Sequence, residues 1–143
     1  MFPQEARGDS MVDFEEQIAM ALVIGYLKRA KPVSRESFWK AMNDLTDLAV
    51  HNIDGFAVEP FFWTMTPQGY PVSDQIAGIV SFYRAAGILS IQLETGSHYV
   101  TDIGQKLIET RQSLLFGGLA EPIISRLEQL IEDYDQRDRA AAS

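Results

Sequence analysis

The sequence predicts a mainly α-helical protein with one small β-hairpin and an appended C-terminal amphipathic helix. The hairpin is indicated by alternating apolar and polar residues over 89–94, followed by turn-forming residues at 95–97. The segment 98–100 can return as the second strand. Thr101 then stands where a helix N-cap belongs, and an apolar stripe of Ile103, Leu107 and Ile108 follows it. We therefore expect the hairpin at about residues 88–101, between two helices.

Three helices are expected before the hairpin. The first follows the N-cap Asp13 and runs from about Phe14 to Ala30, and the second runs from Ser34 to about His51. The third follows the N-cap Ser73 and ends at Gly87, a residue type that favours helix C-termini. The buried face of this third helix is expected to hold Ile76, Ile79, Val80 and Tyr83.

Two helices are expected after the hairpin, from about 102 to 115 and from about 119 to 139, with a break at Gly117-Gly118. This succession of helices around one hairpin is typical of a winged-helix domain. We expect a disordered N-terminus over 1–12, the winged-helix domain over 13–116, and a C-terminal helix over 119–139 as a candidate dimerisation element. Its apolar stripe consists of Ile123, Leu127, Leu130 and Tyr134.

Composition limits the functions that are open to the chain. It has a net charge of −8, 46% hydrophobic residues and no cysteine, so disulfides, thiolate metal sites and cysteine nucleophiles are excluded. The apolar run over 18–27 is too short to span a bilayer. Acidic residues precede this run, where a secretory signal has basic ones. We therefore expect a cytoplasmic protein that does not enter a membrane.

Basic residues are concentrated early in the chain. They cluster between Lys28 and Lys40, whereas the segment 41–83 contains no lysine or arginine. The net charge of −8 opposes general binding to phosphate backbones, but one end of the molecule could still be positive. The candidate nucleic-acid contacts are Lys28, Lys31, Arg35, Lys40, Gln75 and Arg84.

An aromatic segment over 56–70 connects the second and third helices. Pro60 cannot donate to a sheet, so we expect an extended connection with one short edge strand. The rings of Phe61, Phe62 and Trp63 either cover the helical core or form an exposed patch for a partner. The candidate protein interface therefore consists of Phe61, Phe62, Trp63, Ile123, Leu127, Leu130 and Tyr134. The alternative for the C-terminal stripe is that it packs on its own domain.

The residues needed for catalysis are not grouped in the sequence. The only histidines are His51 and His98, far apart and without metal-ligand spacing. The pair Gly117-Gly118 is not followed by the lysine of a phosphate-binding loop. We expect a protein that is not an enzyme, with no catalytic, metal-binding or cofactor-binding residues. His98 is expected at the tip of the hairpin as an exposed turn residue, and the alternative is a phosphate contact or pH sensor.

Two stretches resemble known domains. Residues 84–109, RAAGILSIQLETGSHYVTDIGQKLIE, resemble the end of many bacterial winged-helix domains, in which a helix, two strands around a polar turn and a threonine-capped helix follow one another. Residues 61–80, FFWTMTPQGYPVSDQIAGIV, are similar to the aromatic, serine-capped start of a helix in antitoxin-type domains of the Panacea (SocA-like) class. That class has adjacent glycine and proline, whereas Tyr70 separates Gly69 from Pro71 here. The resemblance implies a helix before this segment and a short hairpin after it.

Two functions follow as alternatives. We favour a non-catalytic protein-interaction module, antitoxin-like or an adaptor or regulatory subunit, because the body is acidic and the hairpin carries no lysine or arginine. Its partners would be another protein, itself as a homodimer, or both. The alternative is a DNA-binding transcriptional regulator whose third helix enters the major groove, with Arg84 as its base-reading residue. The long connection over 51–72 departs from the short turn of a helix-turn-helix.

Overall fold

A computed structural model describes residues 13–29, 32–115 and 118–142 of the chain. Within these residues the chain forms five helices and two separate two-stranded antiparallel sheets, so the prediction of a mainly helical protein with a small hairpin is confirmed. The elements are α1 (Phe14–Leu27), α2 (Arg35–Asn52), β1 (Thr64–Met65), β2 (Pro71–Val72), α3 (Asp74–Ala85), β3 (Leu89–Ile91), β4 (His98–Val100), α4 (Asp102–Leu115) and α5 (Glu121–Ala142).

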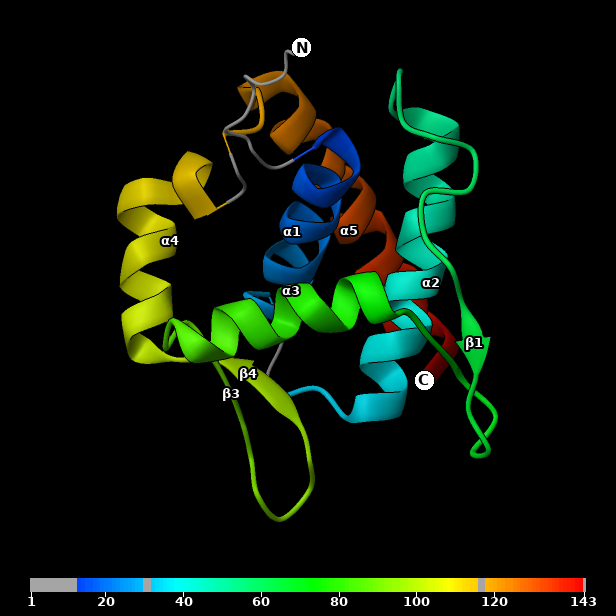
Figure 1. The fold of residues 1–143 in the computed structure, drawn as a ribbon, viewed down its shortest axis with the longest axis vertical. Coiled ribbons are helices and arrows are strands. Elements are labelled where there is room, and N and C mark those ends of the chain that lie inside the picture. Colours follow the sequence, from blue (N-terminus) through cyan, green and yellow to red (C-terminus); the bar gives the residue numbers. More distant parts are fainter. Residues whose placement is uncertain (1–12, 30–31, 116–117, 143) are drawn as a thin grey trace, which may run out of the picture.

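Helix α1 is the centre of the molecule. Helices α2, α3 and α5 all pack against it, and Figure 1 shows α3 crossing the molecule between α4 on one side and α2 on the other. The β3–β4 hairpin projects from the end of α3 (Figure 1). Because α1 is enclosed by three helices, the sequence of α1 has to be apolar on all its faces.

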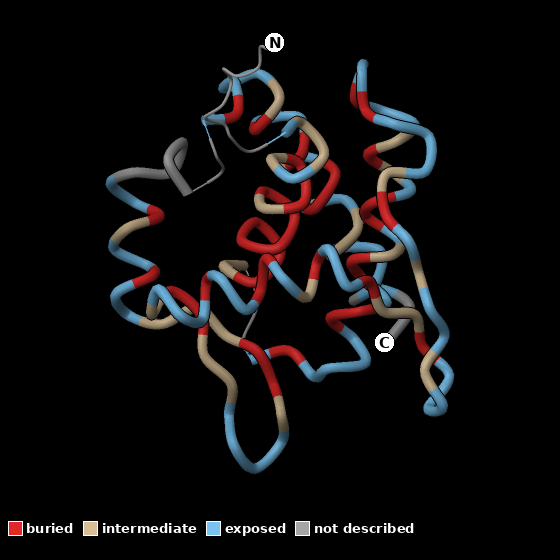
Figure 2. Tube along the Cα trace, in the orientation of Figure 1, coloured by how far each residue is buried: buried red, intermediate tan, exposed pale blue. Residues whose placement is uncertain are grey.

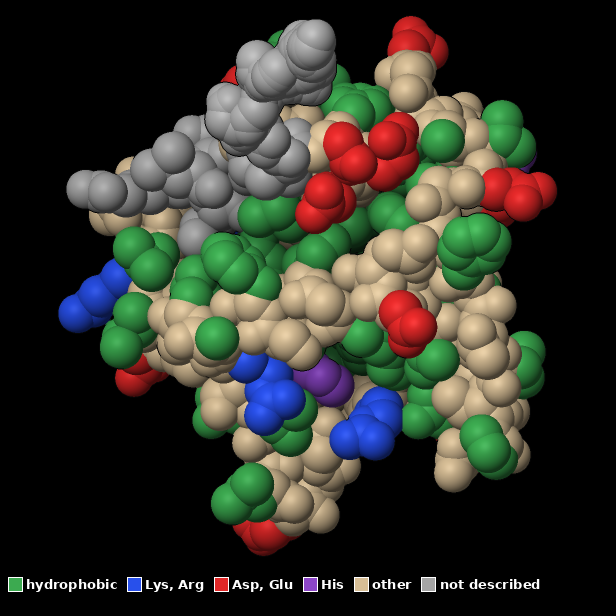
Figure 3. Space-filling model, in the orientation of Figure 1, with side chains coloured by type: hydrophobic (Ala, Val, Ile, Leu, Met, Phe, Trp, Pro, Cys, Tyr) green, Lys and Arg blue, Asp and Glu red, His purple; other side chains and the backbone are tan. Residues whose placement is uncertain are grey.

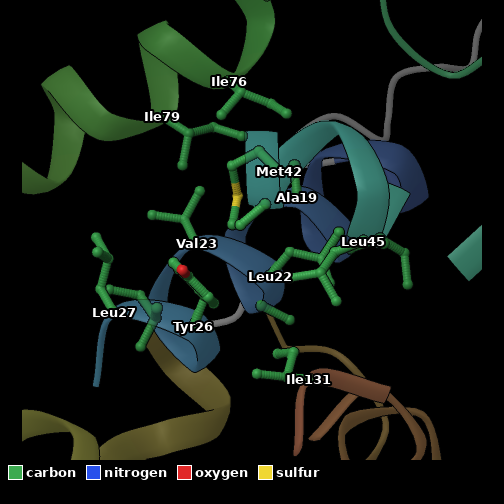
Figure 4. Packing of buried hydrophobic residues seen from close by; sticks show 14 of the residues in the cluster. Ala19, Leu22, Val23, Tyr26, Leu27, Met42, Leu45, Ile76, Ile79 and Ile131 are labelled. Atoms are coloured by element: carbon green, nitrogen blue, oxygen red, sulfur yellow. The ribbon is translucent and has the colours of Figure 1, made fainter. Parts of the chain in front are cut away.

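The hydrophobic core follows from this arrangement. The α1 residues from Ile18 to Leu27 are buried, except for the half-buried Met20, and Figure 2 shows burial along most of this helix. A helix that is apolar all round is stable only when other elements cover it. Figure 4 shows these side chains meeting Met42 and Leu45 of α2, Ile76 and Ile79 of α3, and Ile131 of α5.

The helix N-caps expected from the sequence are present. In each case a side-chain oxygen accepts a hydrogen bond from the backbone N–H three residues later, which satisfies a donor that the first turn leaves open. The capping residues are Asp13 for α1, Ser34 for α2, Ser73 for α3 and Thr101 for α4. Local sequence therefore determines where these four helices begin.

The end of α3 directs the chain into the hairpin. Gly87 has a positive φ of 80°, which a glycine adopts without a steric cost. The N–H of Ile88 donates to the carbonyl of Tyr83 at 2.9 Å, and that of Gly87 donates to the carbonyl of Arg84 at 3.0 Å. These two bonds form the Schellman motif that commonly ends a helix. The prediction that α3 ends at this glycine is confirmed.

The base of the hairpin is held by a third segment of chain. Leu89 pairs with Val100 and Ile91 with His98, in antiparallel register. Val33, between α1 and α2, bridges to His98 through two backbone hydrogen bonds of 2.8 and 2.9 Å. The hairpin is therefore fixed beside the first turn of α2.

The connection between α2 and α3 contains a second hairpin, whereas the sequence led us to expect one edge strand. Met65 of β1 pairs with Pro71 of β2, and a proline is tolerated there because a two-stranded sheet has only edges. The turn is closed by the N–H of Thr66, which donates to the carbonyl of Tyr70 at 2.9 Å. The strands have two residues each, too few for an alternating pattern to be visible in the sequence.

The β3 strand is shorter than the alternation of residues 89–94 indicated. It ends at Ile91, and Leu93 lies on the loop with 99% of its surface exposed. The N–H of Gln92 donates to the carbonyl of Ser97 at 2.9 Å, and the Thr95 hydroxyl bonds to the side chains of both residues. These polar contacts close the loop at Gln92, so the expectation that the strand pattern continues over Leu93 to residue 94 is wrong.

The buried face of α4 also differs from the apolar stripe of Ile103, Leu107 and Ile108 that the sequence predicts. Ile103 is exposed, whereas Gly104 lies against the hairpin: a Cβ atom at Gly104 would stand 2.3 Å from the carbonyl oxygen of Ile88. The close approach of α4 to β3 requires the glycine, and Ile103 therefore points outward. Leu107 and Ile108 do contribute to the core, as expected.

Helix α5 packs against α1 and α2. Of the two alternatives for the C-terminal stripe, the structure therefore shows packing on its own domain, where α5 covers an apolar face of α1. The buried residues of α5 are Ile124, Leu127, Leu130 and Ile131. Among the described residues, no helix combines the length and apolar character that a membrane-crossing helix needs.

Candidate functional site

The basic segment that follows α1 is paired with α5. Lys28 forms an ion pair with Glu128, and Arg29 forms one with Glu132. Lys31 lies outside the described residues. The sequence did not indicate this pairing, because the carboxylates lie a hundred residues further along the chain. The expected positive patch is therefore partly neutralised by the acidic side of α5.

Two more of the predicted nucleic-acid contacts are occupied within the chain. The Lys40 ammonium lies 2.7 Å from a carboxylate oxygen of Glu36, one helical turn away. The Gln75 side-chain oxygen accepts hydrogen bonds from the N–H of Phe62 at 3.3 Å and from the hydroxyl of Ser73 at 3.0 Å. Gln75 thus holds the connection against the start of α3, and its carbonyl is not free to read a base.

Arg35 and Arg84 are the predicted contacts that the fold brings together. Both are exposed and neither forms an ion pair within the described residues. Arg35 begins α2 and Arg84 lies in the last turn of α3. Both charges act on the imidazole of His98, so the two helices contribute positive charge to one place at the base of the hairpin.

His98 is buried, not exposed at the hairpin tip as expected. It is the first residue of β4, only 6% of its surface is exposed, and its ring stacks on Phe38 with centroids 4.9 Å apart. Burial, followed by the charges of Arg35 and Arg84, lowers the pKa of His98 below its ordinary value. The alternation of β4 could have located it, because His98 shares a face with Val100, which packs on the core.

The aromatic segment divides between core and surface. Phe61 is buried, edge-to-face with Phe56 at 6.2 Å between centroids. Trp63 is half-buried and meets Trp39, which is itself buried, edge-to-face at 6.5 Å. Phe62, between these two anchored rings, has 84% of its surface exposed. Of the two alternatives from the sequence, covering the core therefore applies to Phe61 and Trp63, and exposure on the surface applies to Phe62.

Phe62 belongs to a wider exposed apolar area. Val58 is 81% exposed, and Met65 on β1 is also exposed. Val58 and Phe62 line a groove of about 500 Å³ between the connection and α2, and we call this groove with its two apolar side chains the connection surface. The sequence did not predict Val58 as an interface residue, because an isolated valine carries no periodic signal.

The connection surface is acidic as well as apolar. Asp44, Asp47 and Glu59 line the groove, and the segment 41–83 supplies no lysine or arginine to balance them. Figure 3 shows acidic and hydrophobic side chains, and no lysine or arginine, over the part of the visible face that carries β1 and the upper part of α2. The hydroxyl of Thr46, also in the groove, is buried and has no hydrogen-bond partner among the described residues.

The C-terminal residues predicted as an interface lie in or beside the core of the same chain. Leu127 is 1% exposed and Leu130 is buried, whereas Ile123 and Tyr134 are half-buried and packed against the core. The Tyr134 hydroxyl donates to a carboxylate oxygen of Asp44 at 3.1 Å, which joins α5 to α2. The stripe is therefore covered within one chain, and a second copy cannot use it without displacing α5.

No group of three or more metal-ligating side chains occurs in the described part of the chain. His51 is exposed on α2, and its Nδ1 lies 2.8 Å from the carbonyl oxygen of Asp47. The two regions with distinctive side-chain arrangements are therefore the connection surface and the base of the hairpin.

Comparison of this chain with protein-family models, with curated proteins and with solved structures gives no significant match.

Proposed function

We propose that this protein is a non-catalytic winged-helix interaction module, antitoxin-like or an adaptor subunit, whose partner docks on the connection surface. The order of elements supports the winged-helix assignment, because α3, the β3–β4 hairpin and α4 follow one another directly and Val33 adds a third pairing at the hairpin base. The connection between α2 and α3 is longer than the turn of a helix-turn-helix and forms its own hairpin. This addition to the common arrangement is where the docking surface lies.

The exposure of Phe62 carries the proposal. An isolated exposed leucine or valine needs no explanation, but a phenylalanine that is 84% exposed between two anchored aromatic residues is costly in water. Its backbone N–H donates to the Gln75 side chain at 3.3 Å, which ties the segment that carries the ring to the start of α3. Rigid aromatic side chains beside a groove are the groups that most often dominate protein–protein binding energy.

The charges define the chemistry of the partner. Three carboxylates line the groove, and the segment 41–83 has no lysine or arginine. A partner surface with an apolar side chain flanked by lysine or arginine would complement both features. An acidic partner or a nucleic acid would be repelled there.

The alternative function, DNA binding through α3, receives less support from the geometry. Lys28, Arg29 and Lys40 are paired, and Gln75 is hydrogen-bonded to the connection. General DNA affinity grows with the number of phosphates that a protein neutralises, so two arginines would contribute little of it. Of the predicted contacts in the described residues, Arg35 and Arg84 are those left without such a partner.

The test compares Phe62→Ser with Phe82→Ser, an equally drastic change at the exposed Phe82 of α3. Proteins retained from a lysate of the source organism by the wild type and lost with Phe62→Ser would be purified and titrated by calorimetry. We expect a basic partner whose affinity falls by about tenfold or more with Phe62→Ser, whereas Phe82→Ser binds as the wild type does.

Two results would contradict the proposal. One is a purified partner that binds wild type and Phe62→Ser equally well. The other is steeply salt-dependent binding of the wild type to random duplex DNA, which would favour the transcriptional regulator.

A further inference from the structure

Three elements bring polar side chains together at the base of the hairpin. Arg35 begins α2, Arg84 lies in the last turn of α3, and His98 begins β4. The backbone bridge between Val33 and His98 fixes the start of α2 beside β4. Figure 3 shows a histidine between two lysine or arginine side chains below α3, and both arginine charges act on the His98 imidazole. We call these three residues the arginine site.

The two arginines differ from the neighbouring basic residues. Lys28, Arg29 and Lys40 each have a carboxylate partner, whereas Arg35 and Arg84 have none within the described residues. On a chain with a net charge of −8, two adjacent guanidinium groups without carboxylates form a local positive centre. A cationic pair of this kind, without carboxylates beside it, attracts anions.

His98 supplies the second, independent observation. Its side chain is 94% buried, since 6% of its surface remains exposed, and Nδ1 is enclosed without a hydrogen-bond partner among the described residues. Leaving a buried polar atom unpaired costs about 1–3 kcal/mol. The ring is held in place by stacking on Phe38. A buried imidazole with unused hydrogen-bonding capacity, close enough to two arginines for both charges to act on it, is an arrangement that an anion would complete.

We propose that the arginine site binds the phosphate group of a phosphate monoester. The phosphate dianion has three terminal oxygens, so two guanidinium groups from different helices and one imidazole N–H can each bind a different oxygen. A carboxylate, by contrast, has only two oxygens, and the fork of a single arginine can bind both of them. The nucleic-acid backbone is a poorer match, because the adjacent hairpin loop carries Leu93 and Glu94 and no basic residue.

Binding is coupled to the protonation of His98. The charged groups that act on the imidazole are Arg35 from α2 and Arg84 from α3, and both, together with burial, keep it neutral. A bound dianion neutralises the two arginine charges and therefore raises the pKa of His98. Phosphate affinity therefore increases as pH falls through this pKa, until the phosphate itself takes up its second proton.

The experiment is an NMR titration of the full chain with inorganic phosphate and, separately, with O-phosphoserine, at constant ionic strength. The variants Arg35→Gln and Arg84→Gln should each weaken binding by about tenfold or more, because a charge-assisted hydrogen bond is lost. Lys106→Gln, which removes an exposed cation on α4, is the matched control and should bind as the wild type does. Saturating phosphate should also raise the pKa of His98, which its ring proton shifts report.

Each of three results would overturn the proposal. In the first, the wild type gives no saturable shift with either ligand. In the second, the two arginine variants bind phosphate as well as Lys106→Gln does. In the third, random duplex DNA binds more tightly than O-phosphoserine and is lost in the same variants, which would assign the site to a nucleic-acid backbone.

Discussion

The imidazole of His98 stacks on the ring of Phe38 with centroids 4.9 Å apart and planes 19° apart. This contact joins the hairpin to α2, and the charges of Arg35 and Arg84 act on the same imidazole. The histidine therefore combines two features: its ring packs like an aromatic core residue, while its Nδ1 has no hydrogen-bond partner among the described residues. The first prediction separates these features.

Replacing His98 with phenylalanine should stabilise the protein and remove a pH dependence. His98→Phe keeps a stacked ring and removes the unpaired nitrogen, so the free energy of unfolding at neutral pH should rise by about 1 kcal/mol. The pKa of His98 is lowered in the folded chain, so the unfolded chain takes up the proton first as pH falls. Wild-type stability is thus fully present above about pH 6.5 and decreases on acidification, and the variant should lack this decrease.

Urea unfolding between neutral and mildly acidic pH measures this difference. His51→Gln, on the exposed face of α2, is the control and should retain the acid-induced loss. An acid-induced loss of equal size in His98→Phe would assign it to other groups.

Two glycines on neighbouring helices should respond in opposite directions to alanine. A Cβ at Gly104 would lie 2.3 Å from the backbone oxygen of Ile88, which cannot move without shifting β3. Gly104→Ala should therefore destabilise the protein by about 1–3 kcal/mol. Gly78 has no atom within 4 Å of the new Cβ, and Gly78→Ala should stabilise α3 by about 0.5–1 kcal/mol through helix propensity. Thermal unfolding of both variants checks the prediction, which fails if both changes have the same sign.

Shortening Leu127 should weaken the docking of α5 on the domain. Leu127 is 1% exposed, so Leu127→Ala leaves a cavity and should cost about 2–5 kcal/mol. Ser125→Ala, on the exposed side of the same helix, should leave stability nearly unchanged. The midpoint of urea unfolding measures both variants. A Leu127→Ala protein as stable as Ser125→Ala would contradict this packing. A wild type whose stability depends on its concentration would indicate instead that the stripe serves an interface between chains.

Alkaline pH should destabilise the protein through Tyr26. Burial, with smaller contributions from Asp138 and Asp135, raises the pKa of Tyr26 to about 12. The unfolded chain loses the phenolic proton near pH 10, so the contribution of Tyr26 to stability is complete below that value and is lost as pH rises towards about 12. Tyr26→Phe should flatten this part of the stability profile, measured by urea unfolding from neutral pH upward. A profile as steep as that of the wild type would contradict the assignment.

Much of the local structure follows from the sequence, because it depends on neighbours along the chain. Asp13, Ser34, Ser73 and Thr101 cap their helices with bonds to residues three positions away. Gly87 ends α3 through backbone bonds that span a few residues. The apolar residues expected to be buried in α3 are also buried. Capping and periodicity are visible to sequence analysis because one helical turn contains all the atoms involved.

Tertiary structure determines which of the candidate residues are paired, buried or exposed. The sequence identified Arg35, Arg84 and Phe62 as candidates, but only long-range packing shows that Lys28 and Arg29 are paired with α5 and that Phe62 alone of three adjacent rings is exposed. The sequence led us to expect Leu93 within a strand and His98 at the exposed tip of the hairpin, and both expectations are wrong for the same reason. A polar loop ends the strand before Leu93, and the bridge to Val33 holds His98 against α2. Pairing between distant segments depends on which apolar faces meet in the core, and a residue's neighbours in sequence do not contain that information.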